Sequence, residues 1–162
     1  MRSHSIGSAL RTATLAAAED LACLGVCADA LGALDKALAI TVDYTRNRQQ
    51  FGVPIARFQA LQHRMVDMLT RIEMARSVVY LAASACDAGT PQSRATAISA
   101  AKVLVADAAR FVAQQAVQLH GGMGVADESP ISHYFKRLLA AEIRCGSAEA
   151  HLGRYAASMA GS

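Results

Sequence analysis

The sequence predicts an all-α fold, an up-and-down bundle of four long helices with a short C-terminal helix pair. Alanine is the commonest residue, tryptophan is absent and only three prolines occur, and this composition favours long, closely packed helices over sheet. Apolar residues recur at alternating spacings of three and four over long stretches. With 162 residues, of which 53% are hydrophobic and 18% charged, the chain is long enough for one globular domain with its own core.

The first helix is predicted from about Ala9 to Arg46, after a disordered or short lead over residues 1–8. Within it, leucines repeat every seven residues, at Leu24, Leu31 and Leu38. Gly25 and Gly32 lack side chains and would let a neighbouring helix come close.

A second helix is predicted from about Phe58 to Ala88. Its apolar residues fall on one helical face: Phe58, Leu61, Met65, Met68, Ile72, Ala75, Val79, Ala82 and Cys86. The sequence Gly89-Thr90-Pro91 ends this helix, because glycine and proline both disfavour its continuation.

Two further breaks define the remaining helices. A long helix carries Ile98, Val105 and Leu119 on its apolar face and ends at Gly121. Ser129-Pro130 is a typical N-cap and first-turn pair for a shorter helix near Ile131 to Glu142. Gly146-Ser147 interrupts the chain again, and a last helix follows to about Ala160.

The break at Gly121 contains three glycines in four residues, Gly121, Gly122 and Gly124. One glycine is enough to cap a helix, since it adopts positive φ without a Cβ clash. Three indicate that a bulky flat or phosphorylated ligand approaches the backbone closely. The side-chain amides of Gln115 and Gln118, just before the break, are candidates to hydrogen-bond to it.

A second glycine-containing loop, from Arg46 to Pro54, offers guanidinium groups. Arg48 is suited to a bidentate contact with a phosphate, and Phe51 offers an aromatic face. The alternative is a simple turn with a solvated Arg48 and a buried Phe51. Taken together, the two loops suggest a nucleotide-like ligand.

Several other functions have no support in the sequence. The Glu-x-x-His pairs of a di-metal bundle are absent, as are the Gly-x-Ser-x-Gly elbow and the phosphate-binding Walker loop, so no metal site is expected. The net charge of +3 is small and scattered, which argues against nucleic acid as the main partner. The five histidines share no ligand spacing, and most are expected at the surface or at interfaces.

The sequence also bears on location and on the state of its thiols. No apolar stretch is long enough to span a membrane, and residues 1–8 do not resemble a signal peptide. A cytoplasmic location is therefore expected. The chain has four cysteines, Cys23, Cys27, Cys86 and Cys145. They are expected to be reduced thiols, and three of them are expected to pack in helices.

Three segments make the chain recognisable. They are Tyr44-Thr-Arg-Asn-Arg-Gln-Gln-Phe-Gly-Val-Pro-Ile, Phe58-Gln-Ala-Leu-Gln-His-Arg-Met-Val-Asp-Met and Ala116-Val-Gln-Leu-His-Gly-Gly-Met-Gly-Val. In this order and at these separations they resemble the C-terminal helical domain of the acyl-CoA dehydrogenases. The resemblance covers the chain from about Ala9 to Ala160, and residues 9–162 are assigned to this domain.

The resemblance implies a helical bundle that packs against an N-terminal helical domain and a middle β domain, neither of which has a counterpart in this sequence. It implies FAD as cofactor, an acyl-CoA thioester as substrate, an electron-transfer acceptor, and homo- or hetero-oligomers in which this domain contacts the neighbouring subunit's flavin nucleotide. The FAD-binding residues that the family motifs imply are Arg48, on the pyrophosphate, with Phe51, Gln59, Gln118, Gly121 and Gly122.

The sequence departs from the family pattern at the catalytic position. Most members carry a glutamate between the last two helices, which removes the substrate's α-proton while the β-hydrogen leaves as hydride to the flavin. Here the aligned residue is Cys145. Other members place the base on the first helix, at a position that falls near Ala22, and Glu19 lies about one turn earlier on the same face. The catalytic base is therefore left open between Cys145 and Glu19.

A branch of the family lacks this glutamate, and Phe135-Lys136-Arg137 with Gly146 to Leu152 resembles it; the small subunit of pimeloyl-CoA dehydrogenase is of this kind. Such chains assemble with a partner. Two functions follow as expectations: a domain that contacts FAD and mediates oligomerisation in an acyl-CoA dehydrogenase, or a non-catalytic assembly module of a hetero-oligomeric dehydrogenase. The chain is expected to be a fragment or one piece of a split enzyme.

Overall fold

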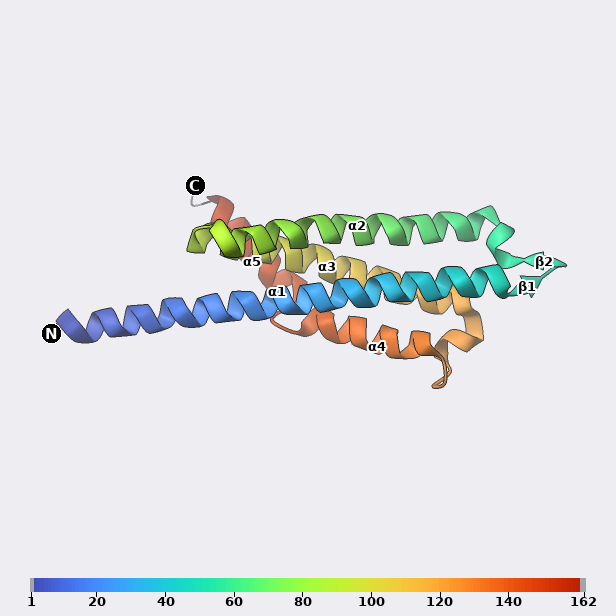
Figure 1. The fold of residues 1–162 in the computed structure, drawn as a ribbon, viewed down its shortest axis with the longest axis horizontal. Coiled ribbons are helices and arrows are strands. Elements are labelled where there is room, and N and C mark those ends of the chain that lie inside the picture. Colours follow the sequence, from blue (N-terminus) through green and yellow to red (C-terminus); the bar gives the residue numbers. More distant parts are fainter. Residues whose placement is uncertain (1, 161–162) are drawn as a thin grey trace.

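Five α-helices make up most of the computed structural model, which describes the backbone of residues 2–160 and the side chains of residues 11–160 (Figure 1). They are α1 (Arg2–Asn47), α2 (Gln59–Ala88), α3 (Pro91–His120), α4 (Pro130–Ile143) and α5 (Ala148–Ala160). Two short connections have structure of their own, a hairpin of β1 (Gln49–Gln50) and β2 (Val53–Pro54) followed by a 3-10 turn over Ile55–Arg57, and a second 3-10 turn over Gly121–Val125.

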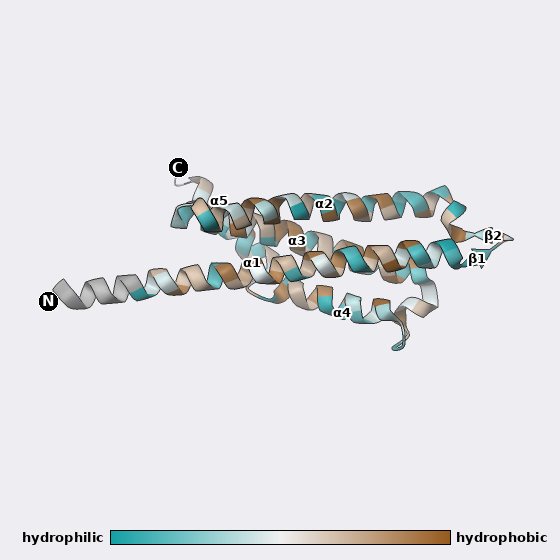
Figure 2. Ribbon diagram, in the orientation of Figure 1, coloured by the Kyte–Doolittle hydropathy of each residue, from teal (hydrophilic) through white to brown (hydrophobic). Residues whose placement is uncertain are grey.

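Helix α3 is the centre of the bundle. It packs against α1, α2, α4 and α5, while α1 also contacts α2 and α4. Each helix carries both hydrophobic and hydrophilic residues, and the hydrophobic ones supply the core (Figure 2). Its largest fully buried apolar side chains are Leu34, Met68, Ile72, Ile98, Ile131 and Leu138.

The predicted all-α bundle is confirmed, with two corrections. Helix α1 begins at Arg2, so residues 2–8 are helical rather than a lead before Ala9. No proline stops the helix there, and α1 continues past the end of the other helices (Figure 1). Of the four bundle helices only α1, α2 and α3 are long, because α4 has 14 residues and forms the short C-terminal pair with α5.

The predicted boundaries of α2 and α4 and the predicted end of α3 are confirmed to within a residue. Thr90 is the N-cap of α3, and its hydroxyl accepts a hydrogen bond from the Ser93 backbone N–H at 3.1 Å. Ser129 occupies the N-cap position of α4, but its side chain makes no capping hydrogen bond. In place of that cap, Pro130 pre-sets the first turn of the helix.

The glycines in α1 do not have the role predicted for them. A Cβ atom on Gly25 or Gly32 would meet no atom within 4 Å, so no helix of this chain approaches them closely. Of the leucines that repeat by sevens, Leu31 is buried, and Leu24 and Leu38 are partly buried against the core. Among the described residues, no helix combines the length and apolar character needed to cross a membrane.

The core also contains a charged side chain. Lys102 on α3 is fully buried, and its Nζ donates hydrogen bonds to the carbonyls of Ala141 at 2.5 Å and Glu142 at 3.0 Å. These carbonyls belong to the last turn of α4, where the helix dipole is negative and favours a cation. Lys102 therefore fixes the end of α4, and with it the position of the turn that follows.

Candidate functional site

The two loops singled out in the sequence meet at one end of the bundle. There the end of α1, the hairpin and the end of α3 surround an open groove of about 480 Å³, which we call the glycine groove. Its lining residues are Tyr44, Arg48, Gln50, Ile55, Gln118, Leu119, His120, Gly121, Gly122 and Met123. Four of the six residues predicted to bind the cofactor thus lie together.

The backbone on both sides holds Arg48 in place. Its N–H donates to the Tyr44 carbonyl at 2.8 Å, and its own carbonyl accepts from Ile55 N–H at 2.8 Å. Between these contacts the chain reverses through Phe51 and Gly52, both at positive φ. Among the described residues, the Arg48 guanidinium has no hydrogen-bonding or ion-pairing partner. An exposed, unpaired guanidinium at the rim of a groove is suited to bind a phosphate.

The three glycines of the second loop have different roles. Gly121 ends α3 at φ +60° and ψ −140°, a conformation that L side chains rarely adopt. Gly122 borders open space, since no atom lies within 4 Å of where its Cβ would be. Gly124 is buried, and a Cβ there would lie 2.6 Å from the Val117 carbonyl oxygen. A ligand thus has room at Gly121 and Gly122, whereas the close approach at Gly124 is made by α3 itself.

An aromatic pair forms the floor of the groove. The rings of Tyr44 and His120 stack with centroids 4.3 Å apart and an interplanar angle of 24°, and the Tyr44 hydroxyl donates to the His120 carbonyl at 3.3 Å. His120 is buried, and its Nδ1–H donates to the Ala116 carbonyl at 2.8 Å. This pair ties the end of α1 to the end of α3, and so sets the distance between Arg48 and the glycines.

The pKa of His120 has a consequence for stability. Burial lowers this pKa below its ordinary value of 6.5, and the hydrogen bond to Ala116 offsets part of that effect. The unfolded chain therefore binds a proton at His120 more readily than the folded one, and the free energy of unfolding should fall as the pH drops below 6.5. We expect urea unfolding above and below this pH to show a smaller loss of stability for His120→Gln than for the wild type. Equal losses in the two proteins would contradict the assignment.

Two predicted cofactor residues lie outside the lining of the glycine groove. Phe51, at the tip of the hairpin, is 90% exposed and meets only the edge of Phe58, with ring centroids 6.1 Å apart. The alternative of a buried Phe51 is therefore wrong. Gln59 is exposed at the first position of α2. Gln115, a candidate amide, accepts a hydrogen bond from Arg64 at 3.3 Å rather than lining the groove.

A second cleft brings together the two candidates for the catalytic base. It has a volume of about 370 Å³, and we call it the thiol cleft. Its lining residues are Glu19, Asp20, Ala22, Cys23, Ile98, Cys145, Gly146, His151 and Arg154. Along α1, twenty-four residues separate Asp20 from Tyr44, and at 1.5 Å per residue they place the two sites about 36 Å apart.

A buried histidine shapes the turn that carries Cys145. His151 on α5 is 1% exposed, and its Nε2–H donates to the Cys145 carbonyl at 2.9 Å while Nδ1 lies 3.3 Å from the Ser99 hydroxyl. Cys145 has a φ of +60°, which is unusual for a residue other than glycine. Gly146 follows at φ +102°, and a Cβ there would lie 3.2 Å from the His151 ring. His151 thereby holds Cys145 at the rim of the thiol cleft.

The histidine prediction needs correction for two residues. His120 and His151 are buried, whereas His63 and His133 are exposed; the side chain of His4 lies outside the described residues. His120 directly precedes the glycine break, so its position in the sequence could have indicated its role. His151 carries no local signal, because its partners come from α3 and from the preceding turn. Among the described side chains, no group of three or more His, Cys, Asp or Glu is placed to hold a metal.

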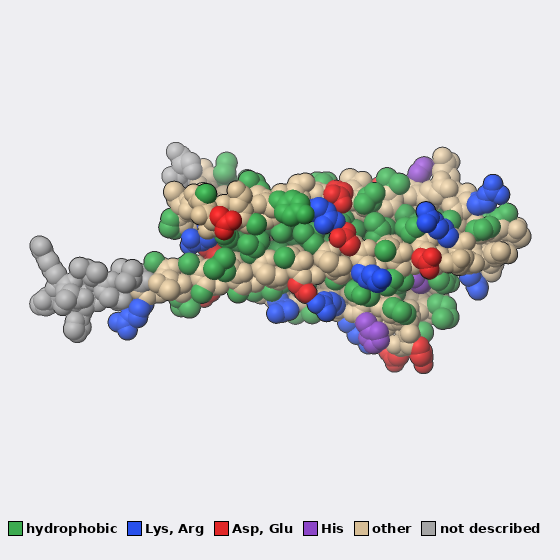
Figure 3. Space-filling model, in the orientation of Figure 1, with side chains coloured by type: hydrophobic (Ala, Val, Ile, Leu, Met, Phe, Trp, Pro, Cys, Tyr) green, Lys and Arg blue, Asp and Glu red, His purple; other side chains and the backbone are tan. Residues whose placement is uncertain are grey.

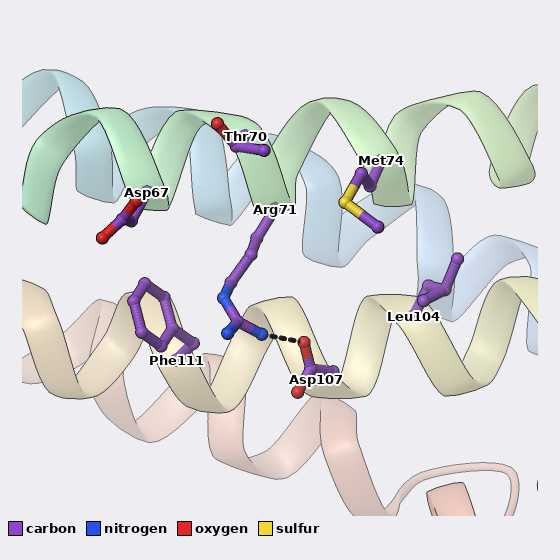
Figure 4. Close-up of a pocket in the computed structure, with 7 residues that line it drawn as sticks. All are labelled: Asp67, Thr70, Arg71, Met74, Leu104, Asp107 and Phe111. Atoms are coloured by element: carbon purple, nitrogen blue, oxygen red, sulfur yellow. Dashed lines mark hydrogen bonds and ion pairs between the residues drawn. The ribbon is translucent and has the colours of Figure 1, made fainter. Parts of the chain in front are cut away.

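A third hollow lies between α2 and α3 (Figure 4). There Arg71 of α2 points toward α3, with its guanidinium 4.1 Å from the centre of the Phe111 ring and in an ion pair with Asp107. Because Arg71 already has these two partners, its guanidinium is not free to bind a ligand. We assign it to packing between the helices.

Comparisons with known proteins match the chain to one family. The profile of the acyl-CoA dehydrogenase C-terminal domain matches residues 20–160. Acyl-CoA dehydrogenase IpdE2 from Mycobacterium tuberculosis is 43% identical over 118 residues, which are 73% of this chain and 35% of that protein.

Comparison with solved structures also finds proteins that contain a domain of this fold. Butyryl-CoA dehydrogenase from Megasphaera elsdenii is similar over 91% of this chain and 38% of its own, with a TM-score of 0.84 and 33% identity. A chain of the ChsE4–ChsE5 complex from Mycobacterium tuberculosis is similar over 89% of this chain and 39% of its own, with a TM-score of 0.83 and 30% identity. The chain therefore spans little more than a third of the length of these proteins.

Proposed function

Because the chain belongs to the acyl-CoA dehydrogenase family, as its C-terminal helical domain, we propose that it contributes one wall of a flavin site in an oligomeric acyl-CoA dehydrogenase. The observation that carries the proposal is the meeting of Arg48, Gln118, Gly121 and Gly122 around the glycine groove. When bound, FAD would accept a hydride from the β-carbon of an acyl-CoA thioester.

The donor groups around the groove fit a flavin dinucleotide. The Arg48 guanidinium would bind the pyrophosphate, whose two phosphates provide paired oxygens for its planar fork. The Gln118 amide would hydrogen-bond to a polar edge of the nucleotide. The open backbone at Gly121 and Gly122 would let the cofactor lie against the end of α3, with no Cβ atom in the way.

The separation of the two sites supports a role between subunits. The glycine groove and the thiol cleft lie about 36 Å apart along α1. This favours an arrangement in which the groove contacts a flavin nucleotide held by a neighbouring subunit, and the thiol cleft faces a different reaction centre. The proposal leaves the catalytic base open between Cys145 and Glu19, which both line the thiol cleft.

The surface of α2 supports an oligomer. Its outward face carries exposed apolar side chains at positions i, i+3, i+8, i+14 and i+15, opposite the face that enters the core: Val66, Leu69, Met74, Tyr80 and Leu81. Figure 3 shows exposed hydrophobic side chains along α2, with charged side chains between them. Apolar side chains gathered on one exposed helix face in this way are typical of a protein–protein interface.

The interface has a direct test. We expect the double variant Leu69→Glu, Leu81→Glu to lower the oligomeric state in sedimentation experiments, because each substitution would place a charge in a buried contact. Exposed Leu15→Glu on α1 is the matched control and should leave the assembly unchanged. An unchanged oligomer in the double variant would contradict a contact through α2.

The cofactor proposal is tested with Arg48→Ala. In the chain purified with its dehydrogenase partner subunits, we expect FAD affinity to fall roughly tenfold to a hundredfold, the effect of losing a charge-assisted pair of hydrogen bonds worth about 1.5–3 kcal/mol. Arg46→Ala removes an exposed charge in the last turn of α1, two residues before Arg48, that does not line the groove, and this variant should retain FAD. Equal FAD retention by both variants would count against the role of Arg48.

The assembly-module alternative predicts a different result from the same preparation. If the chain serves only in assembly, Arg48→Ala leaves FAD content and activity unchanged, while the Leu69→Glu, Leu81→Glu variant abolishes both by dissociating the subunits. The open groove with its unpaired guanidinium favours the flavin-contacting function.

A further inference from the structure

The thiol cleft contains a guanidinium without a counter-charge, next to the turn that carries Cys145. Arg154 of α5 lines the cleft, and its Nη2 lies 3.5 Å from the position that a Cβ on Gly146 would take. The guanidinium therefore lies against the backbone of this turn. In the part of the chain that the structure describes, Arg154 is exposed and has no hydrogen-bonding or ion-pairing partner.

The other charged and hydrogen-bonding groups of the cleft have partners, with Glu19 as the exception. The Asp20 carboxylate accepts a hydrogen bond from Arg94 at 2.8 Å, and both side chains of this ion pair are mostly buried. Both ring nitrogens of His151 are engaged in hydrogen bonds. Glu19 is exposed, and among the described side chains it pairs with none, Arg154 included. The cleft thus offers a ligand one free carboxylate and one free guanidinium.

The residue at position 145 accounts for the missing counter-charge. The family pattern has a glutamate here, and its carboxylate would lie on the turn against which Arg154 packs. Cys145 has no carboxylate to offer, so the guanidinium lacks the partner that a glutamate would supply. A ligand that enters the cleft meets an uncompensated cation beside the position from which the usual base is absent.

We propose that Arg154 binds a carboxylate on the acyl group, so that the thiol cleft selects acyl thioesters that carry a second acidic group. The proposal rests on the proposed function, which supplies the acyl thioester. A planar guanidinium matches the two oxygens of a carboxylate. Glu19 repels a carboxylate, so the acid end of the acyl group is directed to Arg154. The buried side chains of Cys23 and Ile98 also line the cleft and suit the methylene groups of such a chain.

The phosphates of coenzyme A are a second source of anionic oxygens, and the position of Arg154 favours the acyl carboxylate over them. The pantetheine arm separates these phosphates from the thioester carbonyl. Both candidates for the base, Cys145 and Glu19, line the same cleft as Arg154. The reacting carbons of the acyl group therefore belong in this cleft, and the phosphates lie beyond it.

The probe for the experiment is the glutaryl thioester of pantetheine, with its monomethyl ester as the uncharged control of similar size. Both compounds lack phosphate. The full chain is titrated with each, and the amide resonances of Gly146 and Arg154 are followed by NMR. We expect the glutaryl compound to bind about tenfold more tightly, the effect of one charge-assisted pair of hydrogen bonds at an exposed site.

Two variants remove the preference by different routes, and a third is the control. Arg154→Gln should make the affinities of the two compounds equal. Cys145→Glu should do the same, because its carboxylate would pair with Arg154 and repel that of the ligand. Arg144→Gln removes an exposed cation that does not line the cleft, and this variant should retain the tenfold preference.

Equal binding of the two compounds to the wild type, or a preference that survives Arg154→Gln, would overturn the inference. It would also be overturned if butyryl phosphopantetheine bound more tightly than butyryl pantetheine and Arg154→Gln abolished the difference, since Arg154 would then bind phosphate. Binding of neither thioester would overturn it together with the acyl-thioester part of the proposed function. Arg48→Ala should keep the glutaryl preference, so the flavin proposal and this one fail separately.

Discussion

Lys102→Ala is expected to lower the free energy of unfolding by about 2–4 kcal/mol, because it leaves two buried carbonyls at the end of α4 without a donor and opens a cavity in the core. Burying the Lys102 ammonium costs hydration free energy, and the variant does not have this cost. The expected loss of stability is therefore smaller than the sum of the two losses named above. Urea unfolding followed by circular dichroism measures the effect.

The control for this prediction is Lys136→Ala on α4. Lys136 is exposed, and its ion pair with Asp127 spans 3.6 Å between two exposed side chains, so its loss should change stability by no more than about 0.5 kcal/mol. A Lys102→Ala protein as stable as the Lys136→Ala protein would show that the end of α4 is held by other contacts.

Gly124→Ala is expected to destabilise the domain by roughly 1–3 kcal/mol, because the new methyl group would lie 2.6 Å from the Val117 carbonyl oxygen and 3.0 Å from its Cα. These are backbone atoms of α3, so the clash cannot be relieved by rotating a side chain. The turn over Gly121–Val125 would have to move away from α3, and with it one side of the glycine groove. Thermal unfolding measures the loss.

Gly122→Ala is the matched variant in the same turn. A methyl group there meets no protein atom within 4 Å, so stability should stay close to that of the wild type. FAD affinity should nevertheless fall, since the methyl would occupy the space in which the cofactor approaches the backbone. Opposite outcomes, with Gly122→Ala unstable or Gly124→Ala tolerated, would contradict the different roles assigned to the two glycines.

The sequence predicted the parts of the fold that depend on local patterns. The apolar spacing and the breaks at Gly89, Gly121 and Ser129-Pro130 located α2, α4 and the end of α3 to within a residue. The hairpin was not predicted, because two strands of two residues are too short to show alternation, and Phe51-Gly52 is not a common hairpin turn sequence. The start of α1 was placed late because no proline or cap marks it.

The residues of the site fall into the same two groups, those that local sequence patterns mark and those that only tertiary contacts place. Arg48, Gln118, Gly121 and Gly122 were found because each lies in a loop with a recognisable pattern, and the structure gathers them in one groove. Lys102 and His151 were not found, because their partners lie on α4 and in the turn before α5, at distances in sequence that no local pattern reports.

Binding of the FAD pyrophosphate in the glycine groove can be followed by an NMR titration of the full chain with FAD. We expect the amide resonances of Arg48, Gly121 and Gly122 to shift with a common saturation curve and ADP to produce the same pattern. Arg48→Ala should weaken the binding of both ligands about tenfold or more. Shifts confined to the hollow between α2 and α3, or a titration identical in the wild type and Arg48→Ala, would contradict it.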